Sequence, residues 1–216
     1  MELINRTDLE TERLRRMVDR EIVSWPHEKV RTSIRYSRGA DFSGTCYYRT
    51  GRIYVNVGRH VRYPYDLPTQ IARAESNATH WWKALYALRL ADGYELALFV
   101  FLHEFFHWLV AQAGRNLRQK ESMCDRFAAR VLVQRYGVVV VDSDGVPVSP
   151  ETWDFQDVER FVAAARGPGT RRAGDRRCAT AHRPSRERER VGYGPSRRRL
   201  TPAPALGARI IRSGRP

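Results

Sequence analysis

The chain has 216 residues, of which 42% are hydrophobic, enough to bury a core and too many for a wholly disordered protein. The net charge of +14 is uneven: 166–216 holds 15 Arg against three acidic residues, whereas 1–165 carries only +2. The basic character therefore belongs to a tail, and it does not identify the folded part as a nucleic-acid-binding domain. The three cysteines are far apart and form no CxxC pair, which excludes a disulfide framework and a cysteine-rich zinc finger.

Neither a secretory signal nor a membrane span is predicted. The first residues lack the basic-then-apolar layout of a secretory signal. The most apolar stretch, 96–111, is short for a membrane span and is interrupted by His103, Glu104 and His107. We therefore expect a cytoplasmic protein with no membrane partner.

The first part of the chain is predicted to form one helix and a small sheet. Residues 7–23 place apolar side chains on one stripe at helical spacing. Residues 29–58 alternate in polarity and favour strands, with a hairpin across the Thr50-Gly51 turn. Two prolines make 60–68 an irregular segment.

The middle of the chain is predicted to be mainly helical. Gly114 and Gly137 are suited to end helices in the left-handed conformation. Ser149-Pro150-Glu151 has the pattern of a helix start, with proline at the first position. The predicted helices cover 69–90, 94–113, 117–136 and 149–165, and the predicted hairpin covers 138–148.

The C-terminal segment 166–216 is predicted to be a disordered tail, because it has too few large apolar residues to offset the entropy of ordering. The chain is therefore divided into one folded domain, 1–165, and an Arg/Gly/Pro-rich tail. Such a tail either binds phosphate backbones non-specifically or is merely solvated.

A metal-binding motif lies within the apolar 94–113 helix. His103-Glu104-Phe105-Phe106-His107 is an HExxH sequence, whose spacing of four puts both imidazoles on one helix face, one turn apart. Both rings can therefore bind one metal ion. Glu104 projects beside the metal, where it can accept a proton from metal-bound water.

A catalytic zinc ion needs a third protein ligand, and the next helix offers two carboxylates. If Gly114 marks the bend of an antiparallel helix pair, Glu121 is level with His107 and Asp125 is level with His103. We assign Glu121 as the third ligand and Asp125 as the acceptor that orients a histidine ring. The reverse assignment stays open.

The residues 103–125 resemble a known group of enzymes. HExxH followed by Glu121 and Asp125 resembles the gluzincin type of zinc metallopeptidase, and 121–129 is similar to the second-helix pattern of ImmA/IrrE-type (minigluzincin-like) peptidases. The resemblance covers about 94–133 and, more loosely, the 45–57 hairpin. It implies an α+β, zincin-like domain with a small sheet, a motif helix and an antiparallel glutamate helix, and it implies Glu121 as a zinc ligand. The chain departs from the pattern in its short gap before Glu121 and in Cys124, where a small residue is usual.

The predicted function is hydrolysis of peptide bonds in a peptide or protein substrate by a Zn²⁺-activated water. Zinc lowers the pKa of its water toward ~7, and Glu104 acts as the general base. The candidate site is therefore His103, His107 and Glu121 as metal ligands, Glu104 as catalytic residue and Asp125 behind the ligands.

Other interpretations remain open. The two histidines could be core residues satisfied by carboxylates, or the site could bind metal without catalysis. A third interpretation is a nucleic-acid-associated protein. In it the zinc site is structural, with Cys124 or Asp125 as the fourth ligand, and the tail contacts the nucleic acid. Residues 54–56 either form an edge strand that binds an extended peptide or an interior strand. Trp81 and Trp82 are predicted as core residues or as the wall of a cleft.

Overall fold

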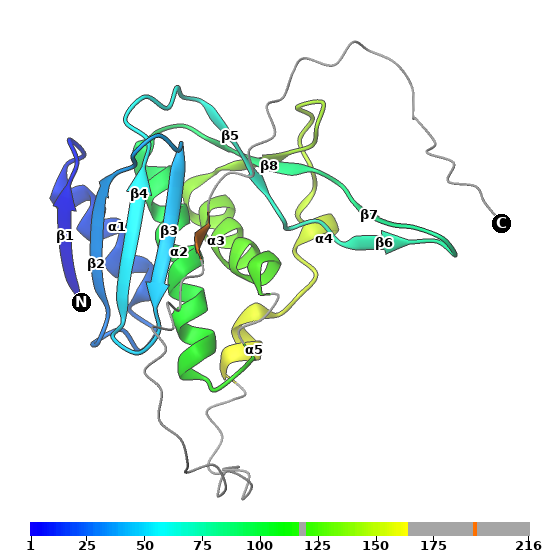
Figure 1. The fold of residues 1–216 in the computed structure, drawn as a ribbon. Helices are drawn as coiled ribbons and strands as arrows, with labels where there is room; N and C mark the ends of the chain where they lie inside the picture. Colours follow the sequence, from blue (N-terminus) through cyan, green and yellow to red (C-terminus); the bar gives the residue numbers. More distant parts are fainter. Residues whose placement is uncertain (117–119, 164–191, 194–216) are drawn as a thin grey trace, which may run out of the picture.

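The computed structural model describes residues 1–116, 120–163 and 192–193 and shows a mixed α and β fold (Figure 1). This confirms the predicted α+β class. The elements in chain order are β1 (Glu2–Arg6), α1 (Thr11–Ile22), β2 (Arg31–Tyr36), β3 (Phe42–Tyr47), β4 (Arg52–Val57), β5 (Tyr65–Thr69), β6 (Ala74–Ser76), β7 (Trp81–Lys83), β8 (Tyr86–Leu90), α2 (Gly93–Gln112), α3 (Glu121–Tyr136), β9 (Val139–Val141), α4 (Pro150–Trp153), α5 (Val158–Ala163) and β10 (Gly192–Tyr193).

The main sheet has the order β1-β2-β4-β3-β10. Strands β1, β2 and β4 are parallel neighbours, whereas β3 runs antiparallel to β4 across the predicted Thr50-Gly51 turn. The predicted hairpin is therefore confirmed. Strand β4 lies between β2 and β3, so 54–56 belong to an interior strand and the edge-strand interpretation is wrong. Strand β1 was not predicted, since it buries a single residue, Leu3.

Helix α1 connects the parallel strands β1 and β2 and packs against α2. Its stripe of Leu14, Val18 and Ile22 is buried, as its spacing predicts. The helix begins at Thr11 rather than at residue 7, because the preceding residues form β1 and the turn after it.

Helix α2 lies at the centre of the fold, in contact with β3, β4, α1 and α3. Its first turn is capped by the Asp92 carboxylate, which accepts hydrogen bonds from the backbone N–H groups of Tyr94 and Glu95. Residues 96–110 are buried on every face. Among the described residues, α2 is the helix whose length and apolar composition would suffice to cross a membrane, and here protein surrounds it.

Helices α2 and α3 are neighbours in the core, as the predicted helix pair requires. Gly114 has a φ of +66° after α2, and Gly137 has a φ of +71° after α3. Both glycines therefore end their helices in the left-handed conformation predicted for them. Part of the predicted start of α3, 117–119, lies outside the described residues.

The predicted helix over 69–90 is wrong, because this segment forms strands. Strands β6 and β7 make a separate hairpin that extends from the body of the fold in Figure 1, and β8 pairs with β5 and β9. The Asn77 side chain accepts hydrogen bonds from the backbone of Thr79 and His80 and closes the hairpin turn. Trp81 and Trp82 are 74% and 46% exposed, so neither is a core residue.

The segment 60–68 is also more regular than predicted, because it contributes most of β5, including Pro68. A proline is compatible with the edge of a sheet, and β5 has β8 as its neighbour at one end of the order β5-β8-β9. The predicted hairpin over 138–148 is present as β9 and a bridge between Val141 and Pro147.

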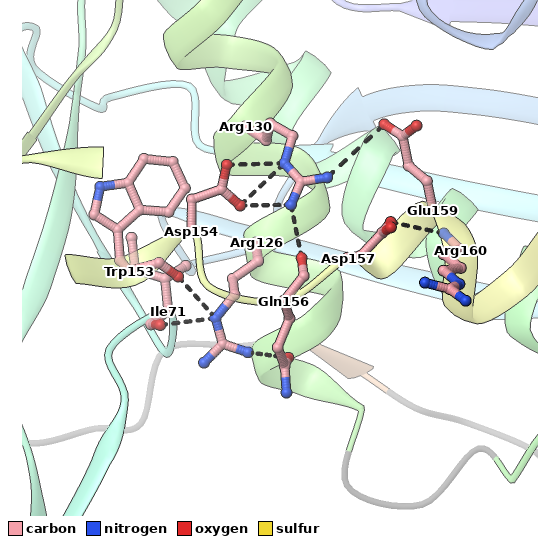
Figure 2. Close-up of polar contacts among 9 residues, drawn as sticks. All are labelled: Ile71, Arg126, Arg130, Trp153, Asp154, Gln156, Asp157, Glu159 and Arg160. Carbon is pink, nitrogen blue, oxygen red and sulfur yellow. Dashed lines mark hydrogen bonds and ion pairs between the residues drawn. The ribbon is translucent and has the colours of Figure 1, made fainter. Parts of the chain in front are cut away.

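The predicted helix over 149–165 is split into α4 and α5 by two arginines of α3 (Figure 2). Arg126 donates to the carbonyl oxygen of Trp153 at 3.1 Å, and Arg130 donates to that of Gln156 at 2.7 Å. Arg130 also holds the Asp154 carboxylate, at 2.5 Å for the shortest contact. These bonds hold the non-helical residues between α4 and α5 against α3.

Arg126 is 3% exposed and holds three separate segments together. Besides Trp153, its guanidinium donates to the carbonyl oxygens of Ile71 and Ala72 at 2.9 and 3.3 Å and to the Gln156 side chain at 2.5 Å. Burial lowers the pKa of this guanidinium, while the negative charges of Asp125 and Asp154 oppose that effect.

We expect Arg126→Met to lower the free energy of unfolding by roughly 3 kcal/mol or more, because it leaves several buried acceptors unpaired. Denaturant unfolding of the full chain measures this loss. Arg13→Met is the matched control, because the Arg13–Asp92 pair is exposed and such pairs contribute about 0–1 kcal/mol. Equal losses in the two variants would contradict the role given to Arg126.

The predicted tail, 166–216, lies outside the described residues except for β10. Strand β10 pairs antiparallel with β3, with Gly192 opposite Thr45 and Tyr193 opposite Gly44. At this point the C-terminal segment is therefore part of the sheet rather than separate from the domain.

Candidate metal centre

The two motif histidines face one another on α2. Both side chains are fully buried, and the Nε2 atoms of His103 and His107 lie 3.2 Å apart. The spacing of four residues brings the rings together one helical turn apart, as the motif predicts. The Nδ1 atom of His107 has no hydrogen-bond partner among the residues that the structure describes.

Glu121, the first residue of α3, reaches both histidines. Its carboxylate oxygens lie 3.2 Å from Nε2 of His103 and 3.3 Å from Nε2 of His107. Two donor atoms that share a tetrahedral zinc ion at about 2.0 Å from it are roughly 3.3 Å apart. The separations among these three side chains therefore fit zinc ligands, and the predicted proximity of Glu121 to the motif is confirmed.

Asp125 lies on the opposite side of the His103 ring. Its Oδ1 atom is 2.8 Å from Nδ1 of His103, and its Oδ2 atom accepts a hydrogen bond of 2.7 Å from the backbone N–H of Gln70. The predicted alignment of Asp125 with His103 is therefore present. Both Asp125 carboxylate oxygens are engaged on the side away from the paired Nε2 atoms, an arrangement suited to orienting the His103 ring with Nε2 toward a metal ion.

Cys124 and the two motif histidines form a compact buried group of possible metal ligands. The nitrogen atoms of His103 and His107 and the Sγ atom of Cys124 all lie within 4.8 Å of one another, so these three side chains could hold a metal ion. Thiolate and imidazole are both zinc ligands. In the sequence, Cys124 is a departure from the peptidase pattern and a possible closing ligand, and the structure places it beside the two histidines.

Glu104 is fully buried between α2 and β3. Neither of its carboxylate oxygens has a hydrogen-bond partner within the described ranges of the chain. Its neighbour is Gly44 of β3, where a Cβ atom would stand 2.3 Å from the Glu104 Oε1 atom, so only glycine allows this approach. A buried carboxylate without a partner is costly to the fold and therefore calls for a functional reason.

The surroundings shift the pKa values of these groups in opposite directions. Burial raises the pKa of Glu104 to about 8, while the charge of His103 and the nearby backbone of Cys46 oppose this. Burial alone would lower the pKa of His103, but hydrogen bonds with Asp125 and Glu121 outweigh it and raise the pKa to about 10. Burial likewise opposes ionisation of Glu121, yet its hydrogen bonds with His103 and His107 hold the pKa of that carboxyl well below its usual range.

Two further groups at the site were missed from the sequence. Gly44 has no sequence signal beyond being a glycine in the segment 29–58, which was predicted to form strands. The Tyr48 hydroxyl is buried without a hydrogen-bond partner among the described residues. Burial, together with the negative charges of Glu104 and Glu121, raises the pKa of Tyr48, so this phenol stays protonated and able to donate. By contrast, His60 and His80 are exposed surface residues.

No family model, curated protein or solved structure matches this chain. The features that bear on function are therefore those of the site itself: two imidazoles, the Glu121 carboxylate, the Cys124 thiol and the buried Glu104 beside them.

Proposed function

We propose that the chain is a zinc metallopeptidase of the HExxH, gluzincin type, and that its domain is zincin-like. The observation that carries the proposal is the group of three donor side chains, His103, His107 and Glu121, whose contacts of 3.2 to 3.3 Å fit a shared zinc ion. Beside them lies the buried Glu104 carboxylate, which has no hydrogen-bond partner in the described part of the chain. The resemblance of 94–133 to ImmA/IrrE-type peptidases supports the same assignment, and with it a cytoplasmic location.

His103, His107 and Glu121 would hold the ion in this proposal, with Asp125 fixing the His103 ring. When bound, zinc supplies Lewis acidity, which lowers the pKa of water toward about 7 and polarises a peptide carbonyl. Glu104 accepts the proton of the attacking water and returns it to the nitrogen of the leaving amine.

The β3 edge supports a peptide as substrate. Strand β3 borders α2, with Gly44 against Glu104, and on its side away from β4 it pairs antiparallel with the two-residue strand β10, whose place a substrate would have to take. A substrate peptide would bind in the same manner, by backbone hydrogen bonds along β3. This replaces the interior 54–56 segment as the proposed peptide-binding strand.

A second candidate function is favoured by Cys124. If its thiolate joins His103, His107 and Glu121, the metal has four protein ligands and no open position for water. The site would then be structural or catalytically inactive, in a protein associated with nucleic acid or regulation. Hydrolysis and the number of protein ligands separate the two candidates.

The experiment that tests the proposal removes and restores the metal. We expect the purified full chain to carry close to one zinc per chain and to cleave a peptide library. Dialysis against a chelator should abolish both, and one equivalent of Zn²⁺, but not Mg²⁺, should restore cleavage, because the donors are imidazole and carboxylate at close spacing.

Cleavage that survives complete removal of zinc would contradict the proposal. A chain that binds one zinc tightly and cleaves nothing in the library would favour the second candidate.

A further inference from the structure

The outer face of the main sheet carries a basic surface that the metal centre does not use. Helices α1 and α2 lie behind the sheet in Figure 1, against the face that holds Leu3, Ile34 and Val55. Strand alternation places the side chains on either side of these three residues in the sequence, and every second one from there, on the opposite face.

The strand register arranges these outward side chains in rows across the sheet. One row contains Arg31 and Arg52, the middle row Ile4 and Tyr54, and the third row Arg6 and Arg35. All four arginines are exposed. At the outward positions of β1 to β4, which are all described, the single acid is Glu2, which lies 3.4 Å from Arg31.

The spacing of the rows leaves an aromatic platform between two lines of positive charge. Arg31 and Arg35 are four residues apart on β2, which corresponds to about 13 Å along a strand. Tyr54 lies between them, with the guanidinium of Arg35 4.8 Å from its ring centroid and the ring of Tyr47 5.8 Å away, edge to face. These rows line a shallow hollow of about 330 Å³.

We propose that this face, hereafter the basic sheet face, binds single-stranded nucleic acid. Its arginine rows would contact phosphates on both sides of a base that stacks on the Tyr54–Arg35 pair. A duplex keeps its bases paired and stacked, out of reach of Tyr54, and an acidic peptide has no use for the aromatic platform. Neither a duplex nor an acidic peptide would therefore use both the arginine rows and the ring of Tyr54.

The basic sheet face is separate from the predicted interaction of the tail. The tail would attract any phosphate backbone through charge alone, whereas the sheet adds a stacking position and a fixed arrangement of charge. The inference does not depend on peptidase activity, because no residue of the metal centre lies on this face.

The test uses the full chain and fluorescein-labelled dT20 and rU20, titrated by anisotropy between 50 and 200 mM NaCl. In Arg31→Gln/Arg52→Gln, the slope of log K against log salt should become shallower by about 1.4, because each phosphate contact on a single strand contributes roughly 0.7. Arg15→Gln/Arg16→Gln on α1 is the matched control: it removes the same charge, its arginines also lie near carboxylates, and its slope should not change.

Tyr54→Leu should weaken binding of dT20 or rU20 roughly 5- to 150-fold, the loss of one stacked base, and change binding of a 20-base-pair duplex less than twofold. Circular dichroism would verify that each variant is folded. The two probes distinguish DNA from RNA.

Equal effects of the two arginine pairs, or an unchanged slope, would overturn the proposal and leave the tail as the binding segment. Tighter binding of poly-glutamate than of dT20 and rU20 would overturn it in favour of an acidic protein partner.

Discussion

Glu104→Gln is expected to lower kcat by about 100- to 10,000-fold while leaving one zinc per chain bound. Glutamine has the size and shape of glutamate but cannot accept the proton of the attacking water. A side chain larger than glutamine would not fit at this position, since the Glu104 carboxylate is fully buried against Gly44. Steady-state kinetics and metal analysis on the same preparation measure both effects.

The thermal midpoint of Glu104→Gln should not fall, because the substitution removes a buried ionisable group that has no hydrogen-bond partner among the described residues. Glu95→Gln is the matched control on the same helix. The Glu95 side chain accepts a hydrogen bond from the backbone N–H of Ala91, which a glutamine oxygen can also accept, so activity should be retained.

Loss of zinc from Glu104→Gln would show that Glu104 is a ligand. Full activity with zinc bound would show that another group accepts the proton.

Glu121→Ala is expected to abolish tight zinc binding, because it removes a side chain with oxygen atoms 3.2 and 3.3 Å from the two Nε2 atoms. Asp125→Asn should weaken zinc binding only about 10- to 100-fold, the usual cost of losing a residue that orients a metal ligand through a hydrogen bond. Competition with a chromophoric chelator measures the zinc affinity of each variant.

Cys124→Ala completes this comparison and separates the two candidate functions. In the proposed catalytic site the thiol is not a ligand, so zinc affinity should change little. A loss equal to that of Glu121→Ala would make Cys124 a ligand and the site closed. Equal losses in Glu121→Ala and Asp125→Asn would mean that both carboxylates coordinate.

Several parts of the candidate site could be predicted from local spacing alone. The HExxH motif places His103 and His107 on one face of α2 whatever residues pack around the helix, because the period of an α-helix is constant. Counting from the bend at Gly114 placed Asp125 beside His103, although α3 begins only at Glu121, since the four residues from Glu121 to Asp125 advance along α3 by the same rise as the four from His107 back to His103 along α2. The cap at Asp92 and the left-handed Gly114 determine where α2 begins and ends.

Other parts followed from contacts between distant segments and could not be predicted locally. The apolar residues of 69–90 have helical spacing in places, yet pairing of β8 with β5 and β9 and the turn at Asn77 stabilise strands instead. The helix over 149–165 is broken by bonds from Arg126 and Arg130, which lie more than 20 residues earlier.

The sequence by itself determined the class of the fold, the central apolar helix and the histidine pair, because these depend on composition and on helical period. Only the tertiary structure decided which strand borders Glu104, that Cys124 joins the donor group, and that four arginines share one face of the sheet. Those features depend on strand order and register, which arise from pairing between segments far apart in the chain and leave no periodic signal within any one of them.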